Sequence, residues 1–510
     1  MRACSYSKKR RTNRNSEKAA NNPSMLPHEP TQVPRIAFAS ARVLAERALP
    51  QVLSDSPWPP AAALEWSPSS LDSSVPILER VRVMPRARAI FWNPSSTHAL
   101  EHNARYGLNT SRTASLDEID GTAGGAELRM SPTEFFSPAL GNVHYTSLGR
   151  LEDIGGQYPE LEQAEALSEI AAEPSRPRLS VWMGTAGAVT QLHHDTDNNF
   201  YAQLHGDKTF LLYPPSATHE AVYLHPRLHP LSHLPVPHAP SEAEAAAGLV
   251  YPPYVSTGVP AAQRVQLRRG DVLFIPAFWG HLATCNRDCI SANVWWPSRY
   301  KLVERELMGL PLPFEVGEWD AALLKQVGVA YLVHMARNAI GGNTTAVQAD
   351  AAAASDDDAS DEAASAAAAA SANAAARDTA SAVQQLFDGR WRHQQLLPQQ
   401  SLLAASRTAS AACSHVPSSQ PATLQAKVEQ YAALRGAILN GVQPAEVRLV
   451  LLHEQLEAIA HFVAGWVAQR PSGAPVEEHG GGGHAEEALS ILIAVHACLV
   501  RESGGEECSS

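Results

Sequence analysis

Residues 189–215, "VTQLHHDTDNNFYAQLHGDKTFLLYPP", decide the fold. Their apolar runs are short, a glycine turn at "HGDK" separates two of them, and none has the period of an amphipathic helix. The same pattern extends over residues 179–300, in runs such as "RVQLRRGDVLFIPAFWGHLATC" and "CISANVWWP". Short strands in series with few helices predict a sandwich or barrel of antiparallel strands.

Two adjacent histidines and an acid stand in the middle of this stretch. Side chains alternate between the faces of a strand, so His193 and Asp195 are expected on one face and His194 on the other. An imidazole and a carboxylate at positions i and i+2 can bind one cation from one side. We therefore expect His193 and Asp195 to be metal ligands, His194 not to be one, and a third ligand to come from elsewhere in the sheet.

The candidate for the third ligand is His281, which closes the stretch "GDVLFIPAFWGH". Two histidines and one carboxylate form the facial triad of non-haem Fe(II) oxygenases, which leaves coordination positions open for a cosubstrate and oxygen. An HxD motif alone is frequent by chance. The second histidine, at the end of a turn-flanked strand, makes the metal site the favoured interpretation.

A dicarboxylate cosubstrate such as 2-oxoglutarate also needs a cation. Lys208 lies on the next predicted strand and could supply this charge. Three neutral polar residues lie on core-like strands, where an unpaired polar group costs about 1–3 kcal/mol. Each is expected to have a partner, either in the protein or in a ligand: Thr190, Asn199 and Asn293.

These motifs, together with "SANVWWP", resemble the JmjC-domain, cupin-like Fe(II)- and 2-oxoglutarate-dependent oxygenases. This family includes the factor-inhibiting-HIF-type asparaginyl hydroxylase and the wybutosine tRNA hydroxylase. The resemblance covers residues 33–300 and is strongest from residue 179. It implies a mainly β core, a double-stranded β-helix or jelly roll, with flanking helices and an α-helical C-terminal tail.

The resemblance also implies roles for the candidate residues. His193, Asp195 and His281 would bind Fe(II), and Lys208 would pair with a carboxylate of 2-oxoglutarate. The cosubstrate pocket would be lined by Thr190, Asn199 and Asn293. Many members of the family carry an aromatic or aliphatic residue between the histidine and the aspartate, where this chain has His194.

The activity that the resemblance implies is O2-dependent hydroxylation of a protein side chain, coupled to decarboxylation of 2-oxoglutarate to succinate and CO2. Alternatives are a histone lysine demethylase, a tRNA-base hydroxylase and a non-catalytic cupin scaffold. No zinc-ligand pattern of a chromatin reader accompanies the core, and the net charge of -12 disfavours tRNA. The triad together with Lys208 disfavours a scaffold.

Composition suggests six segments along the chain. Residues 1–32 form a basic leader that we expect to be disordered, and the Ala/Ser/Asp-rich residues 343–382 form a low-complexity linker. We expect an N-terminal α/β part over 33–178, the catalytic β core over 179–300, a helical extension that packs against it over 301–342, and a helical region over 383–510. The last region has helical spacing on both sides of "NGVQP" and after "GGGG", which predicts a small bundle or a homodimer contact.

Location and partners follow from weaker signals. The run "KKRRTNR" could be a nuclear signal, and the N-terminus lacks the apolar segment of a secretory signal. The apolar run "LSILIAVHACLV" is too short to span a bilayer. Six scattered cysteines fit a reducing compartment, with Cys285 and Cys289 packed in a hairpin. We expect a cytoplasmic or nuclear protein with a protein substrate, and a His-Pro loop at 225–238 over the mouth of the barrel.

Overall fold

The computed structural model describes residues 31–38, 49–75, 77–85, 127–140, 142–150, 178–217, 263–314, 319–340, 374, 377–384, 413, 416–417, 419–468 and 483–502. Residues 1–30 of the predicted leader, the His-Pro loop 225–238 and most of the predicted linker 343–382 lie outside the described residues. The strand pairing begins in the last two residues of the predicted leader, at Thr31.

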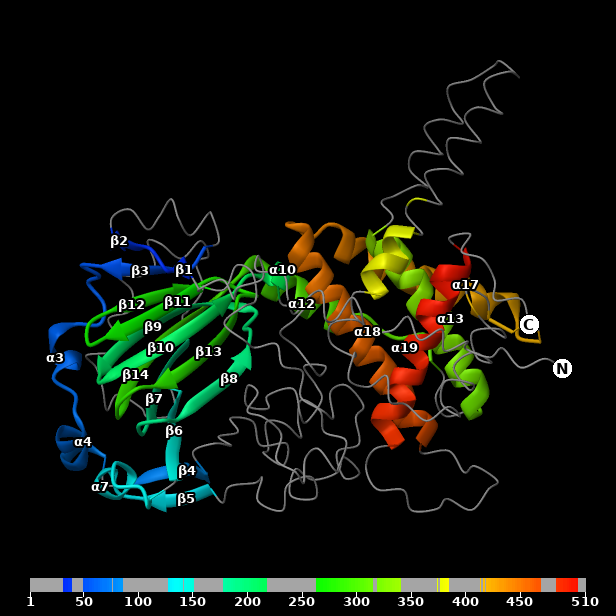
Figure 1. The fold of residues 1–510 in the computed structure, drawn as a ribbon. Helices are drawn as coiled ribbons and strands as arrows, with labels where there is room; N and C mark the ends of the chain where they lie inside the picture. The colour runs from blue at the N-terminus through cyan, green and yellow to red at the C-terminus, as the bar shows by residue number, and fades with distance from the viewer. Residues whose placement is uncertain are drawn as a thin grey trace, which may run out of the picture.

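Two β-sheets form the core of the described structure (Figure 1). The five-stranded sheet has, in spatial order, β1 (Thr31–Gln32), β11 (Gln263–Arg268), β10 (Asp207–Tyr213), β13 (Gly280–Cys285) and β8 (Val189–His193). The nine-stranded sheet has β2 (Arg35–Ala37), β3 (Gln51–Ser54), β12 (Val272–Ile275), β9 (Asp197–His205), β14 (Cys289–Pro297), β7 (Arg178–Gly184), β6 (Asn142–Arg150), β4 (Leu78–Pro85) and β5 (Glu127–Met130).

The chain crosses repeatedly between the two sheets, as in a jelly roll. Strand β8 belongs to the five-stranded sheet, β9 to the nine-stranded sheet and β10 again to the five-stranded sheet, and β12, β13 and β14 alternate in the same way. All strand pairs are antiparallel except β1 with β11 and β2 with β3. The predicted mainly β, cupin-like jelly roll is therefore confirmed.

Strand β9 (DNNFYAQLH) is buried on both faces, although it carries polar residues such as Asn199 and Gln203 beside its apolar ones. Tyr201 packs between the sheets with Phe210 of β10. Phe200 packs on the outer side, in a cluster with residues of three short helices. These helices are α3 (Ala61–Leu64), α4 (Pro68–Ser74) and α7 (Pro132–Phe135).

The predicted turn at "HGDK" joins β9 to β10. Gly206 has φ of 71° there, in the left-handed region that glycine adopts at little cost. A Cβ at this position would also clash with the backbone carbonyl of Asp288. The turn therefore requires glycine for both its conformation and its surroundings.

Helices form the second half of the molecule (Figure 1). After α10 (Pro215–Ala217) they are α12 (Arg299–Gly309), α13 (Ala321–Ile340), α17 (Ala422–Asn440), α18 (Ala445–Ala468) and α19 (Gly483–Glu502). The predicted breaks at "NGVQP" and "GGGG" are confirmed, since α17 ends at Asn440 and α19 begins at Gly483. Among the described residues, none of the helices combines the length and the hydropathy that a membrane span requires.

The sequence led us to expect that helix α13 packs against the β core. This prediction is wrong. The helix lies against α17, α18 and α19, and its residues between Val327 and Met335 are buried except for His334. A helix that is apolar on nearly all sides belongs inside a bundle, because a sheet covers only one of its faces. The C-terminal helices therefore form a bundle around α13 within one chain.

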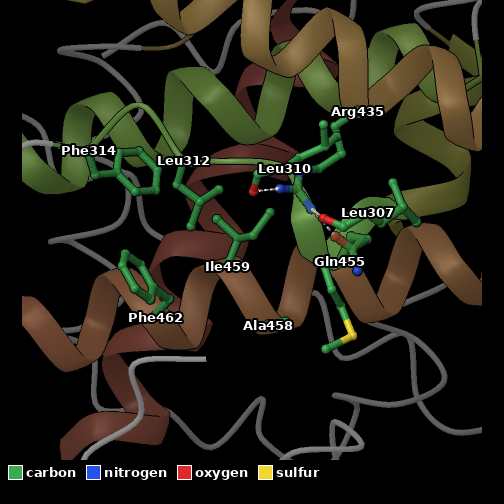
Figure 2. Close-up of a pocket in the computed structure, with 10 residues that line it drawn as sticks. Leu307, Leu310, Leu312, Phe314, Arg435, Gln455, Ala458, Ile459 and Phe462 are labelled. Atoms are coloured by element: carbon green, nitrogen blue, oxygen red, sulfur yellow. Dashed lines mark hydrogen bonds between the residues drawn. The ribbon is translucent and has the colours of Figure 1, made fainter. Parts of the chain in front are cut away.

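This bundle contains a cavity of about 330 Å³ among α12, α17 and α18 (Figure 2). Its walls include Phe314 and Phe462, whose rings are stacked. At its edge, the buried guanidinium of Arg435 donates hydrogen bonds to the carbonyl oxygens of Leu307 and Leu310, to the Gln455 side chain and to the Tyr331 hydroxyl. Arg435 thereby ties the end of α12 to α13 and α18.

Candidate active site

Three of the predicted residues meet where β8 and β13 lie side by side. His193 ends β8, Asp195 lies in the turn that follows, and His281 is directly opposite His193 on β13. The two imidazole rings are 4.2 Å apart, and His281 Nε2 is 3.8 Å from Asp195 Oδ2. One ligand-capable atom from each residue lies within 4.8 Å of the others. The structure thus brings together the three predicted metal ligands.

Neighbouring groups hold two of these side chains in a form suited to a metal ion. His281 Nδ1 donates a hydrogen bond to the carbonyl oxygen of Trp279 at 3.0 Å, which leaves Nε2 facing Asp195. Trp295 Nε1 donates to Asp195 Oδ2 at 3.1 Å. Burial, with the nearby His193, lowers the pKa of His281 to about 4, so the ring is neutral at pH 7. Two imidazoles, of which that of His281 is neutral, and an oriented carboxylate are a donor set that fits Fe(II).

His194 points away from this cluster, as the strand alternation predicted. Its Nε2 lies 2.9 Å from Glu454 Oε1 of α18, and its ring packs against Phe278 at 5.3 Å. Phe278 in turn donates its backbone N–H to the carbonyl oxygen of Asp195. The turn that carries Asp195 is therefore held by the loop before His281 and by the helical bundle.

Lys208 is buried between the sheets, at 1% exposure. Its Nζ donates a hydrogen bond to the Tyr201 hydroxyl at 2.5 Å and lies 6.0 Å from the Tyr145 ring. None of the described carboxylates pairs with it, and burial lowers its pKa to about 7. A buried ammonium without a counter-ion is costly, so this position fits a ligand carboxylate.

The other three predicted residues also face the space between the sheets. Thr190 Oγ1 donates to the Tyr145 hydroxyl at 3.2 Å, and Asn293 Oδ1 accepts from Trp182 Nε1 at 2.7 Å. Asn199 Oδ1 is buried and has no hydrogen-bond partner among the described residues. All three side chains therefore lie in the space between the sheets, and their role in binding a cosubstrate stays a prediction.

Sequence reasoning missed the aromatic residues around Lys208. The Tyr201 hydroxyl hydrogen-bonds the Ser291 hydroxyl as well as Lys208, and burial raises its pKa. Strand alternation could have indicated Tyr201, because it lies two residues after Asn199 and shares its face. Tyr145 comes from β6, outside the stretch that carries the motifs, and no sequence signal marks it.

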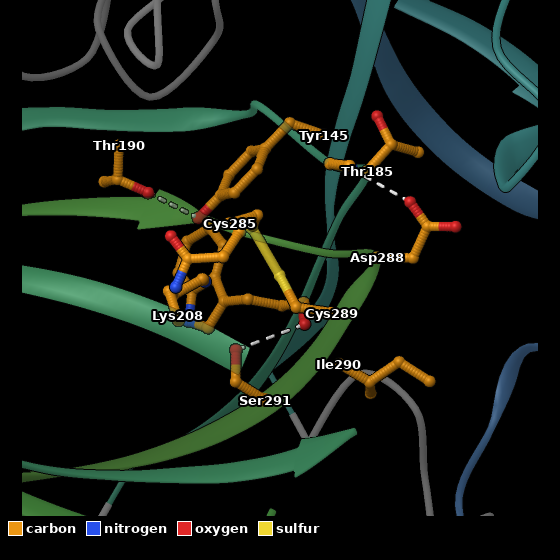
Figure 3. The surroundings of a disulfide bond; sticks show 12 residues. Tyr145, Thr185, Thr190, Lys208, Cys285, Asp288, Cys289, Ile290 and Ser291 are labelled. Carbon is orange, nitrogen blue, oxygen red and sulfur yellow. Dashed lines mark hydrogen bonds between the residues drawn. A yellow bond between two sulfur atoms is a disulfide. The ribbon is translucent and has the colours of Figure 1, made fainter. Parts of the chain in front are cut away.

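The prediction of a hairpin between Cys285 and Cys289 is wrong, because the strands that carry them, β13 and β14, belong to different sheets and do not pair. The structure also joins the two sulfurs in a disulfide, across the turn between these strands (Figure 3). We expected packed thiols, because the spacing of the cysteines is not that of a disulfide framework. Cys285 is the cross-strand neighbour of Lys208, and both cysteines pack in a small cluster with Tyr145. The disulfide therefore closes one end of the space between the sheets.

Comparisons with known proteins agree with this architecture. Residues 125–302 match the family model of the cupin-like domain. The chain is 30% identical over 158 residues to the bifunctional peptidase and (3S)-lysyl hydroxylase JMJD7 of Homo sapiens, covering 28% of this chain and 49% of that protein. It is 28% identical over 149 residues to the lysine-specific demethylase JMJ31 of Arabidopsis thaliana, covering 28% and 24%. It is also 28% identical over 155 residues to the tRNA wybutosine-synthesizing protein 4 of Emericella nidulans, covering 28% and 13%.

The region from β5 to the start of α12 is thus a cupin-like domain. Over this domain the chain is similar to the three JmjC-type and related proteins above, as its motifs predicted. Its matched region spans about half of the length of the human relative and less of the other two.

Proposed function

We propose that this protein is an Fe(II)- and 2-oxoglutarate-dependent oxygenase that hydroxylates a protein side chain and releases succinate and CO2. The observation that carries the proposal is the pairing of two features in one sandwich. A cluster of two histidines and an aspartate lies at the end of β8, and a buried lysine without a described counter-ion lies on β10. The cupin-like domain over residues 125–302 and the similarity of this chain to the human lysyl hydroxylase support it.

In this proposal His193, Asp195 and His281 hold the iron, and Lys208 binds the distal carboxylate of 2-oxoglutarate with help from the Tyr201 hydroxyl. Thr190, Asn199 and Asn293 line the cosubstrate pocket. Bound iron and 2-oxoglutarate supply the activation of dioxygen, which the side chains alone cannot perform. The protein contributes orientation and the exclusion of water.

The walls of the pocket suit this task. Phe210, Leu212 and Ile275 are buried between the sheets and keep the interior apolar. In such surroundings the attraction between Lys208 and a carboxylate is stronger than in water. A bound carboxylate also favours the charged form of Lys208, which burial alone disfavours.

A protein substrate is favoured over tRNA by the net charge of -12, because tRNA binding relies on basic surface. The relatives named as a lysyl hydroxylase and as a lysine-specific demethylase both suggest a side chain of a protein as the substrate. Hydroxylation and demethylation use the same iron site, so the product distinguishes them.

The experiment measures succinate release by the full chain with Fe(II), 2-oxoglutarate and panels of peptides, methyl-lysine peptides and tRNA. A hydroxylated peptide gains the mass of one oxygen, whereas demethylation releases formaldehyde. Asp195→Ala should abolish turnover. Glu65→Gln should not, because Glu65 is exposed and pairs with Arg269 at the surface. No turnover on any panel by protein that binds iron would refute the proposal and favour a scaffold.

The substrate itself can be found with the inactive Asp195→Ala variant. It keeps the walls of the pocket, so it should retain bound proteins that mass spectrometry then identifies. A protein enriched on this variant should gain one oxygen when the wild-type enzyme acts on it.

A further inference from the structure

A second cluster of reactive groups lies in the helical bundle, away from the β core. Cys413, which precedes α17, is hydrogen-bonded to Cys498 of α19. Arg501, one turn further along α19, donates a hydrogen bond from Nη1 to Cys413 Sγ at 3.6 Å. Arg337 of α13 is a second charged group that faces the two thiols.

The two cysteines differ in access and in charge. Cys413 is half-buried, whereas Cys498 is fully buried in the core of the bundle. The hydrogen bond from Cys498 and the charge of the arginines lower the pKa of Cys413 to about 7. The same contact and burial raise the pKa of Cys498. The thiolate, which is the nucleophilic form, therefore develops on the more accessible sulfur.

This arrangement matches what a reversible thiol switch requires. A partly exposed thiolate can react with an oxidant, and a second thiol in contact with it can resolve the product. Two guanidinium groups stabilise the thiolate, in a chain whose overall net charge is -12. We propose that Cys413 and Cys498 are a peroxide-sensitive thiol pair, in which Cys413 is the reacting and Cys498 the resolving cysteine.

The chemistry needs only a hydroperoxide. The Cys413 thiolate attacks one peroxide oxygen, the O–O bond breaks, and the other oxygen leaves as an alkoxide or hydroxide that takes up a proton. This leaves a sulfenic acid on Cys413. The Cys498 sulfur then attacks the Cys413 sulfur, the S–O bond breaks, and the hydroxide leaves as water with the proton of Cys498. In total the two thiols lose two electrons. An organic hydroperoxide is reduced to an alcohol and water, and hydrogen peroxide to two molecules of water.

The disulfide would connect the segment before α17 to the last described helix, α19. These two elements are far apart in the sequence and lie on either side of α18 in the chain order. Reduction by a thiol would restore the open form, so the state of the pair can follow the peroxide and thiol levels. This proposal is independent of the iron site and of the proposed oxygenase activity.

The first test treats the full chain with hydrogen peroxide, alkylates the remaining thiols and maps the peptides by mass spectrometry. Besides the Cys285–Cys289 disulfide, which is present before treatment, we expect one new cross-linked pair, Cys413 with Cys498, and a thiol reductant should reverse it. In the Cys498→Ser variant, Cys413 should stop at the sulfenic acid, which dimedone traps. Peroxide treatment that leaves both residues as thiols, or oxidises Cys498 without Cys413, would overturn the proposal.

The second test measures the alkylation rate of Cys413 against pH. The wild-type rate should rise with a midpoint near pH 7, about two pH units below that of an ordinary thiol. Arg501→Gln should slow alkylation at pH 7 about two- to threefold, because Cys498 contributes more to the low pKa than Arg501 does, and should leave the rate at pH 10 unchanged, because the thiolate is then fully formed. Arg305→Gln, an exposed arginine of α12, is the matched control and should change neither rate.

If Arg501→Gln fails to fold, the wild-type pH profile and the Cys498→Ser result still decide. A wild-type midpoint of an ordinary thiol would show that the arginines do not activate Cys413 and would overturn the assignment of roles.

Discussion

The contact between His194 and Glu454 predicts that the C-terminal helices support the metal site. His194 stands between the two proposed ligands His193 and Asp195, and Glu454 lies 260 residues later on α18. Both side chains are largely buried, with exposures of 2% and 10%. Glu454→Ala removes this hydrogen bond without touching any proposed ligand, so its effect on iron binding measures the support directly.

The magnitude follows from the energy of the contact. Removing one partner of a buried hydrogen bond costs about 1–3 kcal/mol. If this cost loosens the turn that carries Asp195, part of the free energy of iron binding is used to order the turn again. Since about 1.4 kcal/mol corresponds to a factor of ten, the dissociation constant for Fe(II) should rise about 5- to 150-fold. Glu454→Gln keeps a hydrogen-bond acceptor at the same place and should recover most of the affinity.

The assay is an anaerobic titration of the full chain with Fe(II), with circular dichroism to verify that each variant is folded. Glu446→Ala, at an exposed position in the first turn of the same helix, is the control and should bind iron as the wild type does. Wild-type iron affinity in a folded Glu454→Ala protein would refute the reasoning, because the helices would then be neighbours of the site and not part of it.

Three further predictions concern charge and packing. With a pKa of about 7, Lys208 loses its proton as the pH rises above 7. The affinity for 2-oxoglutarate, measured by calorimetry, should therefore fall up to tenfold per pH unit above pH 7, and the Lys208→Met variant should bind weakly at every pH. In the folded protein the pKa of His281 is lowered to about 4, so its contribution to the stability of the metal-free protein is fully present above pH 6.5. The free energy of unfolding, measured with urea at each pH, should fall by about 3 kcal/mol as the pH falls towards 4. Gly436→Ala places a Cβ 2.8 Å from the carbonyl oxygen of Met335, so overpacking of about 1–3 kcal/mol should outweigh the gain of about 0.5–1 kcal/mol in helix propensity. Gly309→Ala meets nothing within 4 Å, so a loss of stability there as large as at Gly436 would contradict the packing argument.

The strands and the candidate triad could be predicted from sequence because each depends on local rules. Strand alternation places His193 and His194 on opposite sides, and the structure does the same, although β8 ends at His193 and Asp195 lies in a turn. The ligand types are restricted by the chemistry of Fe(II). A short motif therefore carries much of the information about the centre of the site.

The environment of the triad could not be predicted in the same way, because it depends on which distant segments pack together. Tyr145 and Glu454 are ordinary residues in their own stretches, and only the fold brings them to Lys208 and His194. The prediction for α13 was wrong for the same reason: its apolar sequence indicates burial but does not show which elements it packs against. The disulfide between Cys285 and Cys289 likewise depends on the geometry of the turn that joins the two sheets, which the count of cysteines does not give.

These long-range contacts divide the site into two parts with different origins. The walls around Lys208 come from the two sheets alone, through Tyr201, Ser291 and Tyr145. The turn around Asp195 also depends on the bundle, because Phe278 belongs to the apolar cluster of the helices while its N–H holds the Asp195 carbonyl. A change in the bundle should therefore weaken iron binding more than the binding of 2-oxoglutarate. The variants of Glu454 and Lys208 separate the two effects.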